Sequence, residues 1–173
     1  KEFTIPFVGL KIGTHQFDYT IDNTFFELFE FDEFNAADLK VLLLLEKKAN
    51  MLELNFDIAG TVNVNCDVTN EPFDLAVTNT LKLVVKFGSD YNDENDELLI
   101  LPHGEYEVNV QQYVYEAAVL SVPQKRIHPG VEDGSLKSEV LHKLEELSPT
   151  QNNNESDEVD PRWNKLKELL KDK

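Results

Sequence analysis

The residues best suited to recognise a binding partner lie near the C-terminus, where Arg162, Trp163 and Lys165 stand in a basic stretch. Trp163 is the only tryptophan of the chain. An indole ring can stack on a nucleobase or fill an apolar pocket, and Arg and Lys side chains can pair with phosphates. These residue types favour recognition of a nucleic acid or of another protein over bond-making chemistry.

The stretch 160–173 is predicted to be a short amphipathic helix. Asp160 can cap its first turn, and Pro161 suits the first helical position because its missing N–H would have had no partner there. The helix either binds a partner or packs its apolar stripe against its own domain, as most amphipathic helices do. Its apolar face consists of Trp163, Leu166, Leu169 and Leu170.

A second basic segment lies between Pro123 and Pro129 and contains Lys125, Arg126 and His128. Two cations and an imidazole this close together could form an anion-binding patch. A solvated loop explains the same residues, and the sequence leaves both interpretations open. We therefore keep Lys125 and Arg126 as candidate partner-binding residues beside those of the C-terminal helix.

Residue patterns that signal catalysis are not found. The chain has no glycine-rich phosphate loop and no Gly-x-Ser-x-Gly elbow. Its single cysteine, Cys66, cannot form an internal disulfide, and its four scattered histidines complete no zinc pattern. Cys66 lies on the same side of the predicted strand as Val62 and Val64. This position favours a role for Cys66 as a small apolar residue of the core. Glu116 could be a buried anchor or simply exposed. We predict no enzyme activity, no metal, no cofactor and no small-molecule substrate.

The segment 88–97 is rich in carboxylates and superficially resembles a calcium loop. A calcium-binding helix-loop-helix needs a central glycine and a helix on either side. No glycine lies between these carboxylates, and a predicted strand precedes them, so we expect a solvated loop. An enzyme that holds a divalent ion there stays open as a further hypothesis; its ligands would come from Asp90, Asp93, Asp96 and Glu97.

The net charge of −17 is unevenly distributed. Residues 1–123 hold 22 acids and 7 bases, whereas residues 162–173 hold 5 bases and 2 acids. An acidic body repels a phosphate backbone but attracts a basic protein, so only the C-terminal end could approach RNA. The sequence has no apolar run long enough for a membrane span and no apolar signal core, so we expect a cytoplasmic protein without membrane association.

Most of the chain before residue 102 alternates apolar and polar residues with a period of two, which predicts half-buried strands. Turn signals at 48–50, Gly60 and 69–72 divide these strands, and such short connections favour antiparallel pairing. A short helix capped by Asp22 or Asn23 is expected over Asn23–Phe31. The predicted strands cover 15–21, 39–45, 52–58, 62–68, 73–77, 81–87 and 98–101.

Helices are predicted mainly after the strands. One begins at Asn109 and ends before Pro123, and another is capped by Ser135 after a loop at Pro129–Gly134. We predict an α+β fold in which a curled, mainly antiparallel meander, shaped like a sandwich or half-barrel, is covered by the helix 109–122. The predicted organisation is a core domain 1–123, a basic loop and helix 124–147, a flexible acidic and polar linker 148–159, and the tail helix 160–173; the last two helices are peripheral.

Three stretches of the chain resemble the YceD family, whose members are linked to the accumulation of large-subunit ribosomal RNA. Residues 60–73 place Cys66 before an acidic-Pro-aromatic turn, similar to the strand that leads into the Cys-x-x-Cys motif of the family. Residues 108–123 resemble the family helix with a central Glu, here Glu116. The third and most specific stretch begins Asp160-Pro161-Arg162-Trp163. The resemblance extends from about residue 60 to the end of the chain.

The chain departs from the family pattern at its cysteines. Thr69 stands in the place of the second cysteine, and no cysteine follows Pro123, so a metal or redox role of those cysteines cannot apply here. Members of a Bacteroidetes-like branch have the same departure. The resemblance implies a non-enzymatic binding factor that supports ribosomal RNA accumulation or ribosome assembly, with ribosomal RNA or a basic ribosomal protein as its partner. The alternative is an acidic adaptor or chaperone for a basic protein, without RNA contact.

Overall fold

The structure is a computed structural model that describes residues 2–148. The chain divides into two units, Lys1–Ser138 and Glu139–Lys173. The predicted linker, apart from Ser148, and the predicted tail helix lie outside the described residues, and with them lie Arg162, Trp163 and Lys165.

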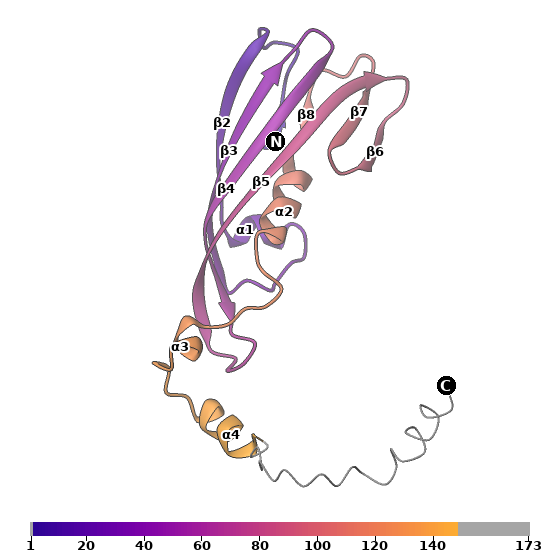
Figure 1. Cartoon of the computed structure of the whole chain (residues 1–173). Coiled ribbons are helices and arrows are strands. Elements are labelled where there is room, and N and C mark those ends of the chain that lie inside the picture. The colour runs from indigo at the N-terminus through magenta and orange to yellow at the C-terminus, as the bar shows by residue number, and fades with distance from the viewer. Residues whose placement is uncertain (1, 149–173) are drawn as a thin grey trace, which may run out of the picture. The chain divides into compact units, whose positions relative to one another are not determined.

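The first unit is built on four long antiparallel strands joined as a meander (Figure 1). A shorter hairpin extends the sheet, because β7 pairs in parallel with β5 and in antiparallel fashion with β6. The strand order is β2-β3-β4-β5-β7-β6. The prediction of an α+β fold with a curled, mainly antiparallel sheet is confirmed. The strands are β2 (Gly13–Ile21), β3 (Ala36–Lys47), β4 (Met51–Asn65), β5 (Pro72–Gly88), β6 (Asn92–Asn95) and β7 (Leu98–Pro102).

The core lies on one face of this sheet, where the period-two pattern places the large apolar side chains. In β4, for example, Leu54, Phe56 and Ile58 are buried, and Asp57 and Ala59 between and beyond them are exposed. Burial of one such side chain stabilises the fold by about 1.5–3 kcal/mol. A strand shifted by one residue would lose this burial, so the alternating pattern determines which face of the strand is directed into the core.

The predicted turn at Gly60 is wrong, because β4 runs through this residue without a break. Gly60 pairs with Leu39 of β3, and the two backbones approach closely there. A Cβ atom at position 60 would overlap the carbonyl oxygen of Asp38 and lie 2.8 Å from the Cα atom of Leu39. The glycine therefore permits a close strand contact, a use of glycine that its presence in the sequence does not distinguish from a turn.

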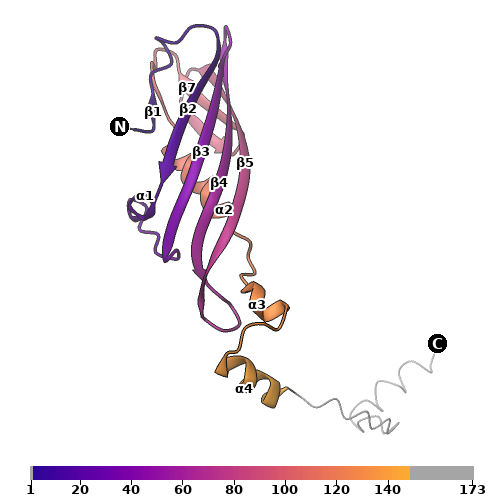
Figure 2. The same cartoon turned by 90° about the vertical axis from the view of Figure 1, so that its left-hand side faces the viewer.

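The inner face of the sheet is covered by α2 (Gln111–Leu120) and by a small two-stranded sheet of β1 (Thr4–Ile5) and β8 (Val108–Asn109) (Figures 1 and 2). Asn109 holds the first turn of α2, since its Oδ1 accepts a hydrogen bond from the Gln111 N–H at 2.8 Å. Val114, Ala117 and Ala118 are buried beneath the helix. The helix begins two residues after the predicted start at Asn109, and its N-cap, Val110, makes no side-chain capping hydrogen bond.

Aromatic side chains pack between the short helix α1 (Asn23–Glu27) with the residues that follow it and α2. Asp22 caps α1 as predicted, accepting a hydrogen bond from the Thr24 N–H at 3.0 Å. Phe29 stacks on Tyr115 of α2 with ring centroids 4.1 Å apart and an angle of 10° between the planes. The other members of this cluster are Phe25, Phe26, Phe31 and Phe34.

Other segments also differ from their predictions, and α1 ends at Glu27 instead of at the predicted Phe31. The acidic segment 88–97 is not all loop, because β6 lies within it. The predicted loop at Pro129–Gly134 contains the short helix α3 (Pro129–Glu132). In the second unit, α4 (Glu139–Leu147) begins four residues after the predicted cap at Ser135, and none of its described side chains is buried. Among the described residues, no helix is long and apolar enough to cross a membrane.

Candidate functional site

Two of the predicted site residues, Lys125 and Arg126, lie in the segment that follows α2. This segment runs alongside the turn between β4 and β5, so that residues about 60 positions apart become neighbours. The backbone N–H of Asp67 donates to the Arg126 carbonyl at 2.8 Å, and the Arg126 N–H donates to Asp67 Oδ2 at 2.7 Å. Lys125 is exposed at the edge of this junction.

Arg126 is held by its neighbours. Its guanidinium forms an ion pair with Glu33 Oε2 at 2.9 Å, and 26% of its side chain remains exposed. Its Nε is buried and has no hydrogen-bond partner among the described residues. Arg126 therefore ties the residues after α1 to the β4–β5 turn, and its charge is partly compensated by Glu33.

Cys66 occupies the centre of the same junction. The thiol is buried, with 2% of the residue exposed, and the N–H of His128 donates to its Sγ at 3.3 Å. Burial opposes the charged thiolate, but hydrogen bonds from the His128 N–H and from the hydroxyl and N–H of Thr69, with a further one from the Val68 N–H, outweigh that effect. Together they lower the pKa of the Cys66 thiol from 9.0 to about 7.

His128 completes the junction without acting as a base toward the thiol. Its Nδ1 accepts a hydrogen bond from the Gly130 N–H at 2.9 Å, which caps α3. Its ring meets that of Phe73 edge to face, with centroids 5.4 Å apart. Since it is the backbone N–H of His128 that contacts Cys66, the pair lacks the nucleophile–base geometry of a catalytic dyad.

A cleft of about 530 Å³ opens beside this junction. It brings Glu33 and Asp67 together with Arg126, so its charges are mixed, and Thr69 is buried next to Cys66 where the family pattern has its second cysteine. Among the described residues, no group of three or more His, Cys, Asp or Glu side chains could hold a metal ion. The residues present do not fit a metal centre at this turn.

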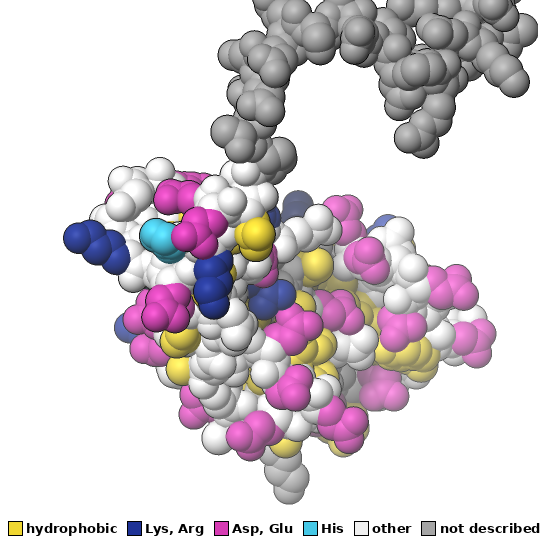
Figure 3. Space-filling model, turned by 90° about the horizontal axis from the view of Figure 1, so that it is seen from below, with side chains coloured by type: hydrophobic (Ala, Val, Ile, Leu, Met, Phe, Trp, Pro, Cys, Tyr) yellow, Lys and Arg dark blue, Asp and Glu magenta, His cyan; other side chains and the backbone are white. Residues whose placement is uncertain are grey.

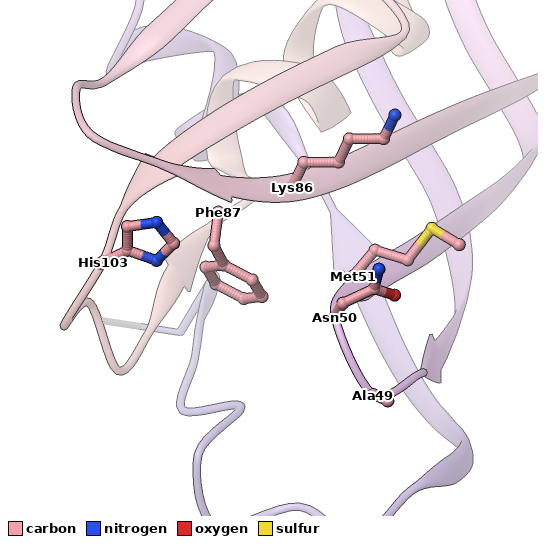
Figure 4. A pocket seen from close by; sticks show the side chains of 6 residues that line it. All are labelled: Ala49, Asn50, Met51, Lys86, Phe87 and His103. Carbon is pink, nitrogen blue, oxygen red and sulfur yellow. The ribbon is translucent and has the colours of Figure 1, made fainter.

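A second cleft, of about 570 Å³, lies where the β3–β4 turn approaches the end of β5 (Figure 4). The Phe87 ring lies between His103 and Met51, whereas the Lys86 amine points away from them. Phe87 also packs on Phe7, with ring centroids 5.5 Å apart. The Lys86 amine and the His103 ring therefore do not face each other across this cleft.

The strongest electrostatic feature of the first unit is its acidity. Carboxylates are spread over the face shown in Figure 3, with few basic side chains among them. The carboxylates on β6 and on the turn that follows it are exposed as well: Asp93, Glu94, Asp96 and Glu97. This surface repels phosphate and suits a positively charged partner.

A third cleft, of about 390 Å³, was not predicted from the sequence. It runs along α2, and we call it the α2 groove. Its apolar residues include Leu81, Tyr113 and Leu120, and the carboxylates of Asp96 and Glu116 border it. One signal in the sequence points to it, because α2 has few polar positions and a single sheet cannot cover a helix that is apolar on several sides.

Comparison with known protein families gives a match. The profile described as "Large ribosomal RNA subunit accumulation protein YceD" matches residues 54–170, which is more than half of the chain. The matched region begins in β4 and includes Cys66, the α2 groove, Lys125 and Arg126. Comparison with curated proteins gives no match, and comparison with solved structures gives none either.

Proposed function

The chain belongs to the YceD family, and from this membership we propose that it is a non-enzymatic binding factor that supports the accumulation of large-subunit ribosomal RNA during ribosome assembly. The family match over residues 54–170 is the observation that carries the proposal. The matched region extends through the stretch that holds Arg162, Trp163 and Lys165. A role in ribosome assembly also implies a cytoplasmic location.

In the proposed mechanism, two parts of the chain contact different partners. The body, with 22 acids and 7 bases in residues 1–123, binds a basic ribosomal protein. The stretch 162–173, with 5 bases and 2 acids, contacts ribosomal RNA or a second protein. Trp163 stacks on a base or fills a pocket, and Arg162 and Lys165 pair with phosphates.

Lys125 and Arg126 have unequal parts in this mechanism. Lys125 is exposed and can pair with a phosphate of RNA that approaches the junction. Arg126 already donates to Glu33 at 2.9 Å, so binding a phosphate would require the breaking of that ion pair. We therefore assign Lys125 the larger share of any contact with RNA at this segment.

The acidity of the body supports a second candidate function, an adaptor or chaperone for a basic protein without RNA contact. A surface that carries many exposed carboxylates can shield a basic protein before assembly. The two functions differ in what remains bound after RNA is destroyed. Capture by an adaptor survives ribonuclease, whereas capture through RNA does not.

An affinity pull-down at low salt, with and without ribonuclease, tests the proposal when RNA sequencing and mass spectrometry are read together. Recovery of large-subunit RNA and ribosomal proteins that is lost on nuclease treatment supports the assembly factor. Recovery of one basic ribosomal protein in both samples favours the adaptor. Recovery of neither RNA nor ribosomal protein refutes both functions.

The substitution Trp163→Ala tests the role of the C-terminal stretch. We expect weaker capture of the partner and a melting temperature close to that of the wild type, because the proposed contact is with a partner and not with the core. Trp163→Phe serves as the matched control, since a phenyl ring can still stack, and it should retain most of the capture. A large fall in melting temperature with unchanged capture would make Trp163 a core residue.

A further inference from the structure

We propose that the α2 groove binds a basic segment of a partner protein and receives one bulky apolar side chain from it. The inference deepens the proposed function, on which it rests for the ribosomal identity of the partner. The groove itself is defined by contacts within the first unit. Its outline is formed by Asn79, Leu81, Asp96, Tyr113, Ala117 and Leu120.

The apolar part of the groove is not covered by any described side chain. Leu120, at the last position of α2, is 77% exposed, although this helix is otherwise packed on the sheet. Leu81 and Tyr113, which line the same groove, are half-buried. Removal of apolar surface from water is favourable, so a partner that covers these three side chains gains binding free energy.

The position of the groove wall is fixed before any partner binds. Asn79 of β5 donates a hydrogen bond from Nδ2 to the Ala117 carbonyl at 2.8 Å, which ties the middle of α2 to the strand. Tyr115, which also lines the groove, stacks on Phe29. A preformed groove loses little conformational entropy on binding, which favours affinity for a short segment.

The border of the groove is negatively charged. Asp96 and Glu116 line it, and Asp93 lies close enough to act on Tyr113. Burial, the neighbouring Tyr91 and the charges of Asp93 and Glu116 raise the pKa of Tyr113 to about 12. Among the described residues that line the groove, none is basic.

An apolar floor with an acidic border fits Lys and Arg side chains around one apolar anchor. The Lys or Arg side chains would meet Asp96 and Glu116, and the anchor would lie on Leu81 and Leu120. A phosphate backbone would instead meet carboxylates, so RNA is the disfavoured occupant. Charge complementarity therefore selects a basic protein segment.

Fluorescence anisotropy on the full chain tests this inference with synthetic peptides. The probe is a fluorescein-labelled helical peptide of Lys, Arg and Ala with one central Leu, and its partner peptide has Ser in place of that Leu. We expect Leu120→Ser to weaken binding of the Leu peptide about fivefold and to leave the Ser peptide nearly unaffected. Leu28→Ser is the matched control, because Leu28 is also exposed, at 68%, and lies outside the groove.

The acidic border is tested by the double variant Asp96→Asn with Glu116→Gln. It should weaken binding of the Leu peptide about tenfold at low salt and reduce the salt dependence. The matched control is Glu27→Gln with Asp32→Asn, two exposed acids outside the groove, which should leave the affinity unchanged.

Four results would overturn the inference. Two are equal weakening by Leu28→Ser and Leu120→Ser, and an absence of discrimination between the Leu and Ser peptides. A third is loss of binding of labelled oligouridine in the Leu120→Ser variant, which would make RNA the occupant. The fourth is tighter peptide binding in Trp163→Ala, which would make the C-terminal stretch of the chain a competitor. If the peptide binds as expected but the pull-down recovers no ribosomal component, the ribosomal function is refuted. The inference that the α2 groove binds a basic peptide then still holds.

Discussion

The pH dependence of stability should reveal the thiolate of Cys66. The perturbation is the substitution Cys66→Ser, which keeps a hydrogen-bond acceptor for the His128 N–H but removes the group that titrates. In the wild type the thiol is buried, and the hydrogen bonds from the His128 and Thr69 segments lower its pKa from 9.0 to about 7. The folded state therefore releases the thiol proton at a lower pH than the unfolded state.

The sign and the size of the effect follow from this difference in pKa. Between pH 7 and pH 9 the unfolded chain binds the thiol proton more often than the folded chain, so the free energy of unfolding rises with pH. The contribution is fully present above pH 9 and is lost as the pH falls through 7. A shift of this size corresponds to at most about 2.7 kcal/mol, since one pKa unit is worth about 1.36 kcal/mol.

The assay is urea unfolding of wild type and Cys66→Ser, followed by far-UV circular dichroism at a series of pH values from below 7 to above 9. Groups that titrate in both proteins cancel in the difference, which should rise by about 1–2.7 kcal/mol across this window. Cys66→Ala is the control: its difference from the wild type should have the same pH dependence with another constant offset. A difference that stays flat, or that falls with pH, would refute the hydrogen-bonded thiolate.

Two further predictions concern packing. Gly60→Ala should lower the free energy of unfolding by about 3 kcal/mol, because the added methyl group would overlap the Asp38 carbonyl, whereas Gly9→Ala, where a Cβ meets nothing within 4 Å, should be nearly neutral in the same urea titration. A double-mutant cycle of Phe29→Leu and Tyr115→Leu should give a coupling of about 0.5–1.5 kcal/mol for the stacked rings, and additive effects would show that the stack contributes only its buried area.

Elements with a strong periodic signal could be predicted from the sequence alone. The alternation of Leu39, Val41, Leu43 and Leu45 specified both the strand and its buried face, because a strand exposes successive side chains to opposite sides. The start of a helix was also predictable where a side chain caps it, as Asp22 does for α1. Local chemistry controls such features, so no knowledge of the rest of the chain is needed.

The role of a single residue does not follow from the sequence in this way, because it depends on neighbours distant in sequence. Glycine is common in turns, but Gly60 lies within a strand. The close approach of β3 explains why this position needs a residue without a Cβ atom. The acidic segment 88–97 has little apolar content, yet pairing with β7 makes part of it a strand. In both cases a partner strand overrides local preference.

The candidate sites divide in the same way. The sequence by itself identified the basic residues Lys125 and Arg126, the acidity of the body and the motifs shared with the YceD family, because residue type and order carry that information. Only the tertiary structure paired Arg126 with Glu33, placed Cys66 beneath the His128 N–H, and set Leu120 beside Leu81 in an acidic groove. Charge and pattern are properties of the linear chain, whereas burial, pKa and grooves arise when folding brings distant segments into contact.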